Sequence, residues 1–170
     1  MYKMITDENA EVIAKFVKET SGNIAEVGVS IGDTAEVICQ NKGDRTFYLF
    51  DTFTGHPFEG IIREKDATQQ KEGKHVAKIE DVQERLKYPN LIWKKGFFPD
   101  TAEGKDFGFV NLDTDLYIGT FEGLKYFYPR MRKGGVILIH DYPDISGVRK
   151  AVDEFGIKGK QLNSNQYLIR

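Results

Sequence analysis

The sequence predicts an α/β domain built on a doubly wound, mostly parallel sheet that ends in an antiparallel hairpin. Apolar runs of strand length alternate along the chain with amphipathic segments of helical length, which is the pattern of parallel strands joined by right-handed helical crossovers. A turn containing two glycines, at residues 26–34, joins the first of these strands to a helix. Two short runs near the C-terminus flank residues 163–165, whose asparagine and serine side chains favour a hairpin turn.

Length and composition limit the class of protein. With 170 residues, 40% of them hydrophobic, the chain suits a single domain with its own core. The net charge of −2 and the small size of the basic clusters predict no nucleic-acid partner. A lone cysteine, Cys39, excludes an internal disulfide and fits a reducing compartment, and no run approaches the ~20 apolar residues of a membrane span. We expect one soluble, cytoplasmic domain over residues 1–170 with no membrane partner.

The N-terminal part of the chain predicts helices and strands in alternation. Within residues 1–22, an apolar stripe indicates a helix that packs on the sheet. The elements expected here are a helix at 7–20, a strand at 24–29, a helix from the turn to about Asn41, and a strand at 46–50 that ends at Asp51. Residues 52–75 follow without periodicity, and their glycines and charges indicate a mobile lid loop.

The C-terminal part repeats the alternation. The elements expected are a helix carrying Val76, Ile79, Val82 and Leu86, strands at 91–93 and 107–112, a helix carrying Phe121, Leu124 and Phe127, a strand at 136–139 after the Gly134-Gly135 turn, a helix carrying Val148, Ala151, Val152 and Phe155, and hairpin strands around Gln161 and at 166–169. In such a sheet, ligands bind outside the carboxyl ends of the strands. Asp51, Asp113 and Asp141 all fall at those ends.

The turn at residues 26–34 allows three interpretations. It is compatible with a dinucleotide fingerprint, with a nucleophile elbow because Gly28-x-Ser30-x-Gly32 matches GxSxG, and with the acidic glycine loop that holds S-adenosylmethionine. Asp33 stands where the third glycine of the dinucleotide motif would fall, and its carboxylate would repel a pyrophosphate. The cationic sulfur and amine of S-adenosylmethionine are instead favoured by acids around the turn.

The hydrolase interpretation has one further argument in its favour and two against it. Ser30, Asp113 and His140 follow one another in the chain order of a serine hydrolase triad. However, only one helix precedes the turn, whereas the hydrolase elbow lies deep in a sheet whose earlier strands supply the oxyanion loop, and Asp51 would have no role. A serine hydrolase that uses Ser30 is therefore a remote alternative.

Asp51 is the strongest single candidate for cofactor binding. It lies 25 residues after Glu26, at the end of the second strand, where a carboxylate can accept both hydroxyls of a ribose. The alternative is an acid that starts a turn with Thr52 and Thr54. The glycine turn upstream favours the ribose role.

A second group of polar residues follows the ends of two later strands. Its members are Asp113, Asp115, His140 and Asp141. Oxygen ligands with one imidazole suit a divalent cation such as Mg²⁺ or Mn²⁺. The same residues are equally consistent with acids that cap the following helices, beside a hydrogen-bonded core histidine.

Several blocks of the sequence resemble the macrocin O-methyltransferase (TylF-type) family. The blocks are Glu26-Val27-Gly28 with Gly32, Phe50-Asp51-Thr52-Phe53-x-Gly55-x-Pro57, Gly96-Phe97-Phe98-x-Asp100-Thr101, Leu112-Asp113-x-Asp115-Leu116-Tyr117, Tyr128-Pro129-x-Met131-x-x-Gly134-Gly135, Asp141-Tyr142 and Gly147-Val148-Arg149-x-Ala151-Val152-Asp153-x-Phe155. The resemblance spans about residues 24–170. It implies the seven-stranded, Rossmann-like class I methyltransferase fold.

The resemblance also implies a reaction and a site. Family members depend on S-adenosylmethionine and a metal ion, and they methylate sugar hydroxyls of natural products. The cofactor-binding residues predicted on this basis are Glu26, Gly28, Ser30, Gly32, Thr34, Asp51, Thr52, Gly96, Phe97 and Asp113. The residues predicted to be both catalytic and metal-binding are Asp113, His140 and Asp141. We expect O-methyl transfer to a hydroxyl of a sugar or other small molecule, in a monomer or a homo-oligomer.

The chain departs from the family pattern at one metal position. Where the family has Asp-Asp-Tyr, this sequence has His140-Asp141-Tyr142, so one anionic ligand is replaced by an imidazole or lost. The alternative from another functional class is accordingly a non-catalytic module that binds S-adenosylmethionine but has lost its metal. The chain is also shorter than family members with long N-terminal and lid segments, so the macrolide-sugar substrate does not carry over.

Overall fold

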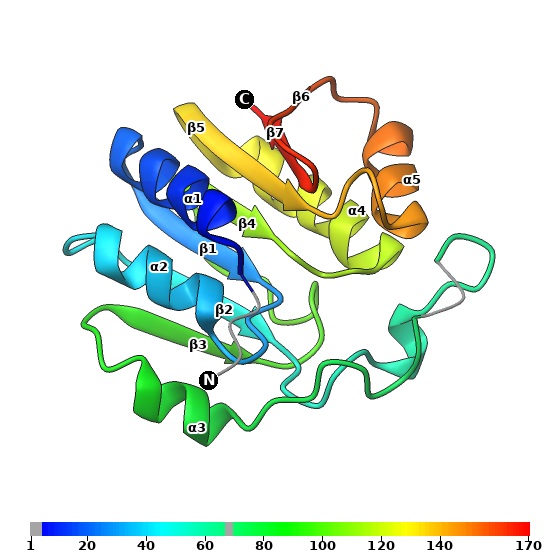
Figure 1. The fold of residues 1–170 in the computed structure, drawn as a ribbon, viewed down its shortest axis with the longest axis horizontal. Helices are drawn as coiled ribbons and strands as arrows, with labels where there is room; N and C mark the ends of the chain where they lie inside the picture. Colours follow the sequence, from blue (N-terminus) through cyan, green and yellow to red (C-terminus); the bar gives the residue numbers. More distant parts are fainter. Residues whose placement is uncertain (1–4, 67–69) are drawn as a thin grey trace.

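A single sheet forms the centre of the molecule in the computed structural model, which describes residues 5–66 and 70–170 (Figure 1). Within these residues seven strands follow the order β3-β2-β1-β4-β5-β7-β6. The parallel strands are β1 (Asn23–Val27), β2 (Phe47–Asp51), β3 (Leu91–Lys95), β4 (Phe107–Leu112) and β5 (Met131–His140). The strands β6 (Lys160–Gln161) and β7 (Gln166–Ile169) add the antiparallel hairpin. The predicted fold class is confirmed.

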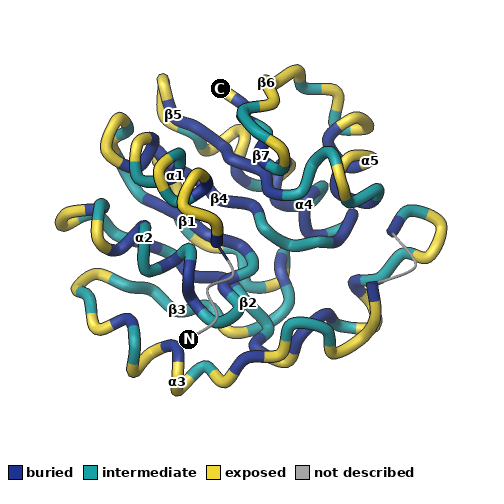
Figure 2. Tube along the Cα trace, in the orientation of Figure 1, coloured by how far each residue is buried: buried dark blue, intermediate teal, exposed yellow. Residues whose placement is uncertain are grey.

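Helices cover both faces of the sheet, as Figure 1 shows. Buried side chains of α1 (Asp7–Glu19), α2 (Asp33–Asn41) and α3 (Ile79–Arg85) belong to one core cluster, and those of α4 (Tyr117–Phe127) and α5 (Ser146–Phe155) to a second. Alternate residues of the strands enter the two clusters, since Ile24 packs with the first and Ala25 with the second. The central strands β1, β2 and β4 are therefore largely buried on both sides, visible as the dark centre of Figure 2.

The register of the sheet brings the predicted site residues to one edge. Val27 of β1 pairs with Phe50 of β2 and with Leu112 of β4, and Leu112 pairs with Ile139 of β5. The next residue of each strand or turn therefore lies at the same level, beyond the paired strands. Those residues are Gly28, Asp51, Asp113 and His140.

Two element boundaries differ from the sequence prediction by more than two residues. The helix α3 begins at Ile79, so Val76 lies before it and 59% of its surface is exposed. The strand β5 begins at Met131, before the glycines rather than after them. Gly134 has φ 80° and the β4–β5 register shifts at this level, so the two glycines form an irregularity within the strand.

In the irregular stretch between β2 and α3, residues 55–56 and residues 73–75 lie side by side and are joined by backbone hydrogen bonds. We call these two segments the arms of a stem. The short 3-10 helix η1 (Phe58–Gly60) lies within the stretch. The His56 N–H donates to the Lys74 carbonyl and the Gly73 N–H donates to the His56 carbonyl, both at 2.9 Å. The two arms approach so closely that a Cβ on Gly55 would lie 2.6 Å from the Gly73 carbonyl carbon. The predicted lid includes residues 67–69, which lie outside the described residues, and its mobility stays a prediction.

In the part of the chain that the structure describes, no helix combines the length and the apolar character needed to cross a lipid bilayer.

Candidate active site

A cavity of about 270 Å³ lies at the carboxyl ends of the parallel strands. Most residues predicted to bind a cofactor or a metal line it, namely Gly28, Ser30, Thr34, Asp51, Thr52, Gly96, Phe97, Asp113, His140 and Asp141. Glu26 and Gly32 are the two predicted residues outside its lining. The parallel register explains why side chains so far apart in sequence meet here.

The turn after β1 is packed directly against the end of β4. Gly28 has φ 91°, and a Cβ at this position would lie 1.9 Å from the Asp113 carbonyl oxygen. The Gly28 N–H donates to the Phe50 carbonyl, and the Asp113 N–H donates to the Val27 carbonyl, both at 2.9 Å. Gly28 is thus required for close backbone packing as well as for the bare wall of the cavity.

Asp51 holds the turn in place and keeps acceptor capacity for a ligand. Its Oδ2 accepts a hydrogen bond from the Ser30 N–H at 2.8 Å, and its Oδ1 accepts one from the Phe53 N–H at 2.7 Å. A carboxylate has about four acceptor positions, so two remain for ligand hydroxyls. Both predicted roles of Asp51, in the turn and in ligand binding, are compatible with this geometry.

Glu26 lies under the turn in the core. Its side chain is fully buried, its Oε1 accepts a hydrogen bond from the Asn111 amide at 2.9 Å, and its Oε2 has no hydrogen-bond partner among the described residues. Burial raises the pKa of Glu26 to about 8, against the opposing effect of the Asn111 hydrogen bond and with a further increase from Asp51. Its direct contact with a cofactor, like that of Gly32, stays a prediction.

The buried Glu26 predicts a pH-dependent cost to stability. Its pKa rises from 4.5 to about 8 on folding, so between these values the native state retains a proton that the unfolded chain has released. The unfolding free energy therefore falls as pH rises through this window. Glu26→Gln cannot ionise, and its stability relative to the parent should increase by about 3–4 kcal/mol between pH 5 and pH 8. Urea unfolding at both pH values measures this change, and the exposed Glu8→Gln is the control, for which no such change is expected.

Three carboxylates face one another across the cavity. Asp113, Asp115 and Asp141 place oxygen atoms within 4.8 Å of one another. Burial raises the pKa of Asp113 well above its usual range, and the charges of Asp115 and Asp141 raise it further. Burial, followed by the charge of Asp115, raises the pKa of Asp141 to about 6. The three carboxylates therefore repel one another when they are charged. Their oxygen atoms form the donor set preferred by a hard divalent cation.

The observed cluster differs from the predicted ligand set by one residue. Asp115, rather than His140, joins Asp113 and Asp141 in the three-carboxylate cluster. His140 lies beside it, with Nδ1 3.8 Å from Asp113 Oδ2 and Nε2 3.3 Å from the Gln166 amide nitrogen. Burial lowers the pKa of His140 to about 4, so the imidazole is neutral near pH 7. The role of His140 as a ligand stays a prediction, and Asp115 is the third carboxylate of the observed cluster.

The contacts of His140 argue against the hydrolase alternative. A triad would require one imidazole nitrogen to face the Ser30 hydroxyl and the other to face an acid. In the structure Nδ1 faces Asp113 and Nε2 faces Gln166. Neither nitrogen is directed to Ser30 in these contacts.

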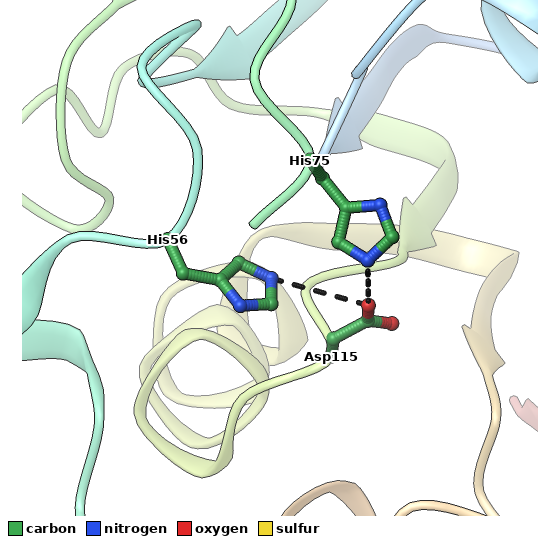
Figure 3. Close-up of side chains that lie close together, drawn as sticks. All are labelled: His56, His75 and Asp115. Atoms are coloured by element: carbon green, nitrogen blue, oxygen red, sulfur yellow. Dashed lines mark ion pairs between the residues drawn. The ribbon is translucent and has the colours of Figure 1, made fainter. Parts of the chain in front are cut away.

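Two histidines that the sequence analysis did not select lie against Asp115 (Figure 3). His75 Nε2 is 3.1 Å and His56 Nε2 is 3.9 Å from Asp115 Oδ2. Burial favours a raised pKa for Asp115, but His75, His56 and Lys74 outweigh it and lower the pKa. The sequence contained one indication of this histidine pair: two of the three histidines of the chain occur in the predicted lid, near its ends.

Comparisons with known proteins agree with this fold. The sequence model of the macrocin-O-methyltransferase (TylF) family matches residues 3–165. The chain is 26% identical over 179 residues to demethyldecarbamoylnovobiocin O-methyltransferase of Streptomyces niveus, a match that covers 92% of this chain and 68% of that protein. It is 27% identical over 151 residues to 8-demethyl-8-(2,3-dimethoxy-alpha-L-rhamnosyl)-tetracenomycin-C 4'-O-methyltransferase of Streptomyces olivaceus, covering 79% of this chain and 58% of that protein.

The solved structure of the O-methyltransferase NovP is similar in fold. It superposes with a TM-score of 0.81 at 20% sequence identity, covering 97% of this chain and 80% of NovP. The family match spans nearly the whole chain. The chain therefore belongs to the macrocin-O-methyltransferase (TylF) family of S-adenosylmethionine-dependent O-methyltransferases.

Proposed function

We propose that this protein transfers the methyl group of S-adenosylmethionine to a hydroxyl of a sugar or glycosylated small molecule, with the help of a divalent cation. The observation that carries the proposal is one cavity that joins the glycine turn and Asp51 to the three-carboxylate cluster. The name of the Streptomyces olivaceus relative describes a rhamnosyl-bearing substrate. That name supports a sugar hydroxyl as the acceptor here.

The cofactor half of the cavity suits an adenosine with a cationic tail. The free acceptor positions of Asp51 match the two hydroxyls of a ribose, and the bare backbone at Gly28 lets the ligand approach closely. Phe97 lines the same side and offers an aromatic edge or face to the adenine. The carboxylates beyond the turn favour the positive charge of the sulfonium.

The acceptor half of the cavity suits a divalent cation held by Asp113, Asp115 and Asp141. Their mutual repulsion and the raised pKa of Asp113 support a positively charged ligand at this position. A bound Mg²⁺ or Mn²⁺ would supply a Lewis acid that lowers the pKa of the acceptor hydroxyl. The chain itself contributes position: the Gly28 turn contacts the Asp113 backbone, so methyl donor and acceptor are held on one rigid edge of the sheet. The neutral His140 beside Asp113 is placed to take up the proton.

Asp51→Ala should weaken the binding of S-adenosylhomocysteine at least ~tenfold, because it removes charge-assisted hydrogen bonds to the ribose. Isothermal titration calorimetry measures the effect, with Asp51→Asn as a variant that keeps the side-chain shape. Asp44→Ala, which removes an exposed aspartate outside the cavity lining, is the matched control and should bind like the parent. The parent should bind S-adenosylhomocysteine more tightly than NAD. The reverse order would contradict the cofactor assignment.

Methyl transfer itself is tested with isotope-labelled S-adenosylmethionine and a panel of sugars and glycosylated compounds, with Mg²⁺, with Mn²⁺ and with excess chelator. The expected result is metal-stimulated labelling of an acceptor hydroxyl. Tight binding of S-adenosylhomocysteine without labelling of any acceptor would instead identify a non-catalytic binding module. Full activity in excess chelator would refute the metal requirement and leave methyl transfer standing.

A further inference from the structure

Two imidazoles and a carboxylate converge in the lining of the cavity, and the proposed methyl transfer gives the imidazoles no role (Figure 3). His56 and His75 come from the two arms of the stem between β2 and α3, and Asp115 comes from the turn after β4. The nearest ligand atoms of the three side chains all lie within 4.8 Å of one another. The imidazole rings of His56 and His75 are not stacked, because their centroids are 5.3 Å apart and the angle between the ring planes is 55°.

The polar atoms of this group lack the partners that buried groups normally have. His75 Nε2 is buried and lies 3.1 Å from Asp115 Oδ2, a contact that lowers the pKa of Asp115 but lacks the geometry of a regular hydrogen bond. His56 is 9% exposed, and its buried Nδ1 is also without a partner in the described part of the chain. A neutral imidazole nitrogen and a carboxylate oxygen that face each other at this distance are two acceptors unless a proton or a metal ion lies between them.

The distances fit a small transition-metal ion. Zn²⁺ with bonds of ~2.0–2.2 Å in tetrahedral geometry separates its ligand atoms by about 3.3–3.6 Å. The two distances to Asp115 Oδ2, 3.1 Å from His75 and 3.9 Å from His56, lie on either side of that range. Small side-chain adjustments would therefore complete three ligands and leave a fourth position for water.

The backbone holds both histidines where the ion would need them. The reciprocal hydrogen bonds of His56 with Gly73 and Lys74 fix the crossing of the two arms, and Gly55 permits that close approach. His75 adopts φ 65° and Asp115 φ 57°, a left-handed conformation that costs about 1 kcal/mol or more for residues with a Cβ. The side chains of His75 and Asp115 point toward one another (Figure 3).

We propose that His56, His75 and Asp115 form a binding site for a transition-metal ion of the Zn²⁺ class, which fastens the stem of the 52–75 stretch to the end of β4. Two imidazoles with one carboxylate favour Zn²⁺, Co²⁺ or Fe²⁺ over Mg²⁺. The site is thus chemically distinct from the three-carboxylate cluster, although Asp115 belongs to both. Lys74 is the cation nearby, and its ammonium donates to the Gln70 amide oxygen.

The test is a titration of the metal-stripped protein with Zn²⁺ in the absence of Mg²⁺, which would compete for Asp115. The parent should bind one Zn²⁺ per chain. His75→Ala and His56→Asn should each raise the Kd for Zn²⁺ by at least ~10–100-fold, the effect known for losing only a partner of a ligand. His140→Gln, the matched histidine control, and Asp113→Asn, which disrupts the carboxylate cluster, should keep the affinity of the parent. Circular dichroism confirms that each variant is folded.

Trypsin cleavage at Arg63, Lys65, Lys71 and Lys74 tests the fastening. Zn²⁺ should slow cleavage in the parent and have no effect on His75→Ala. Absence of Zn²⁺ binding in the parent, or equal affinity in the His56 and His75 variants, would overturn the site and leave a proton between His75 and Asp115 instead. Zn²⁺ binding without protection would overturn the fastening. Methyl transfer enters neither readout, so these outcomes are independent of the proposed function.

Discussion

Asp113→Ala should lower kcat for methyl transfer by at least ~10³-fold. Asp113 is a proposed ligand of the cation, and it also lies beside His140, the proposed proton acceptor. A positioned proton-transfer group and a Lewis-acid site each contribute about 10²-fold or more. Asp113 stands at the end of β4, in the carboxylate cluster, and 3.8 Å from the imidazole of His140. The measurement is single-turnover labelling of the acceptor with saturating S-adenosylmethionine.

Folding and catalysis should separate in this variant. The pKa of Asp113 is raised by burial and then by the charges of Asp115 and Asp141, so its carboxylate is an unfavourable group in the native state without a cation. Removing it should leave the thermal midpoint unchanged or higher. Asp44→Ala should retain full turnover. An Asp113→Ala enzyme that methylates as fast as the parent would show that the cluster has no catalytic role.

Gly28→Ala should lower the unfolding free energy by about 4 kcal/mol or more, the range of the most disruptive single substitutions. The added Cβ would lie 1.9 Å from the Asp113 carbonyl oxygen and 2.7 Å from its carbon, at φ 91°. These are backbone atoms of the adjacent central strand end, so relief requires that β1 and β4 move apart. Urea unfolding monitored by circular dichroism measures the loss.

Gly43→Ala provides the matched control. Gly43 also has a positive φ, 61°, but a Cβ there has no neighbour within 4 Å. Only the conformational strain of about 1 kcal/mol should appear. An equal loss of unfolding free energy in the two variants would contradict the packing role of Gly28. Gly28 would then serve only the close approach of the ligand.

The sequence predicted those site residues whose position is determined by the end of a strand. Parallel strands align their carboxyl ends, so the apolar runs that end at Asp51, Asp113 and Asp141 were enough to place three acids at one edge. The glycine turn and the family blocks then indicated S-adenosylmethionine rather than a dinucleotide. Their information is local, because it lies in residues that are neighbours along one strand and its turn.

Only the tertiary structure decided which side chains meet across that edge. Periodicity does not describe the irregular stretch after β2, so nothing in the sequence placed His56 and His75 against Asp115. The exchange of His140 for Asp115 in the carboxylate cluster depends on how two turns leave neighbouring strands, with φ 57° at Asp115 and 56° at Asp141. Sequence by itself determined the fold, the edge and the acids, whereas the packing of turns and of the stem determined the ligand groups, because contacts between non-periodic segments depend on backbone geometry that no local pattern encodes.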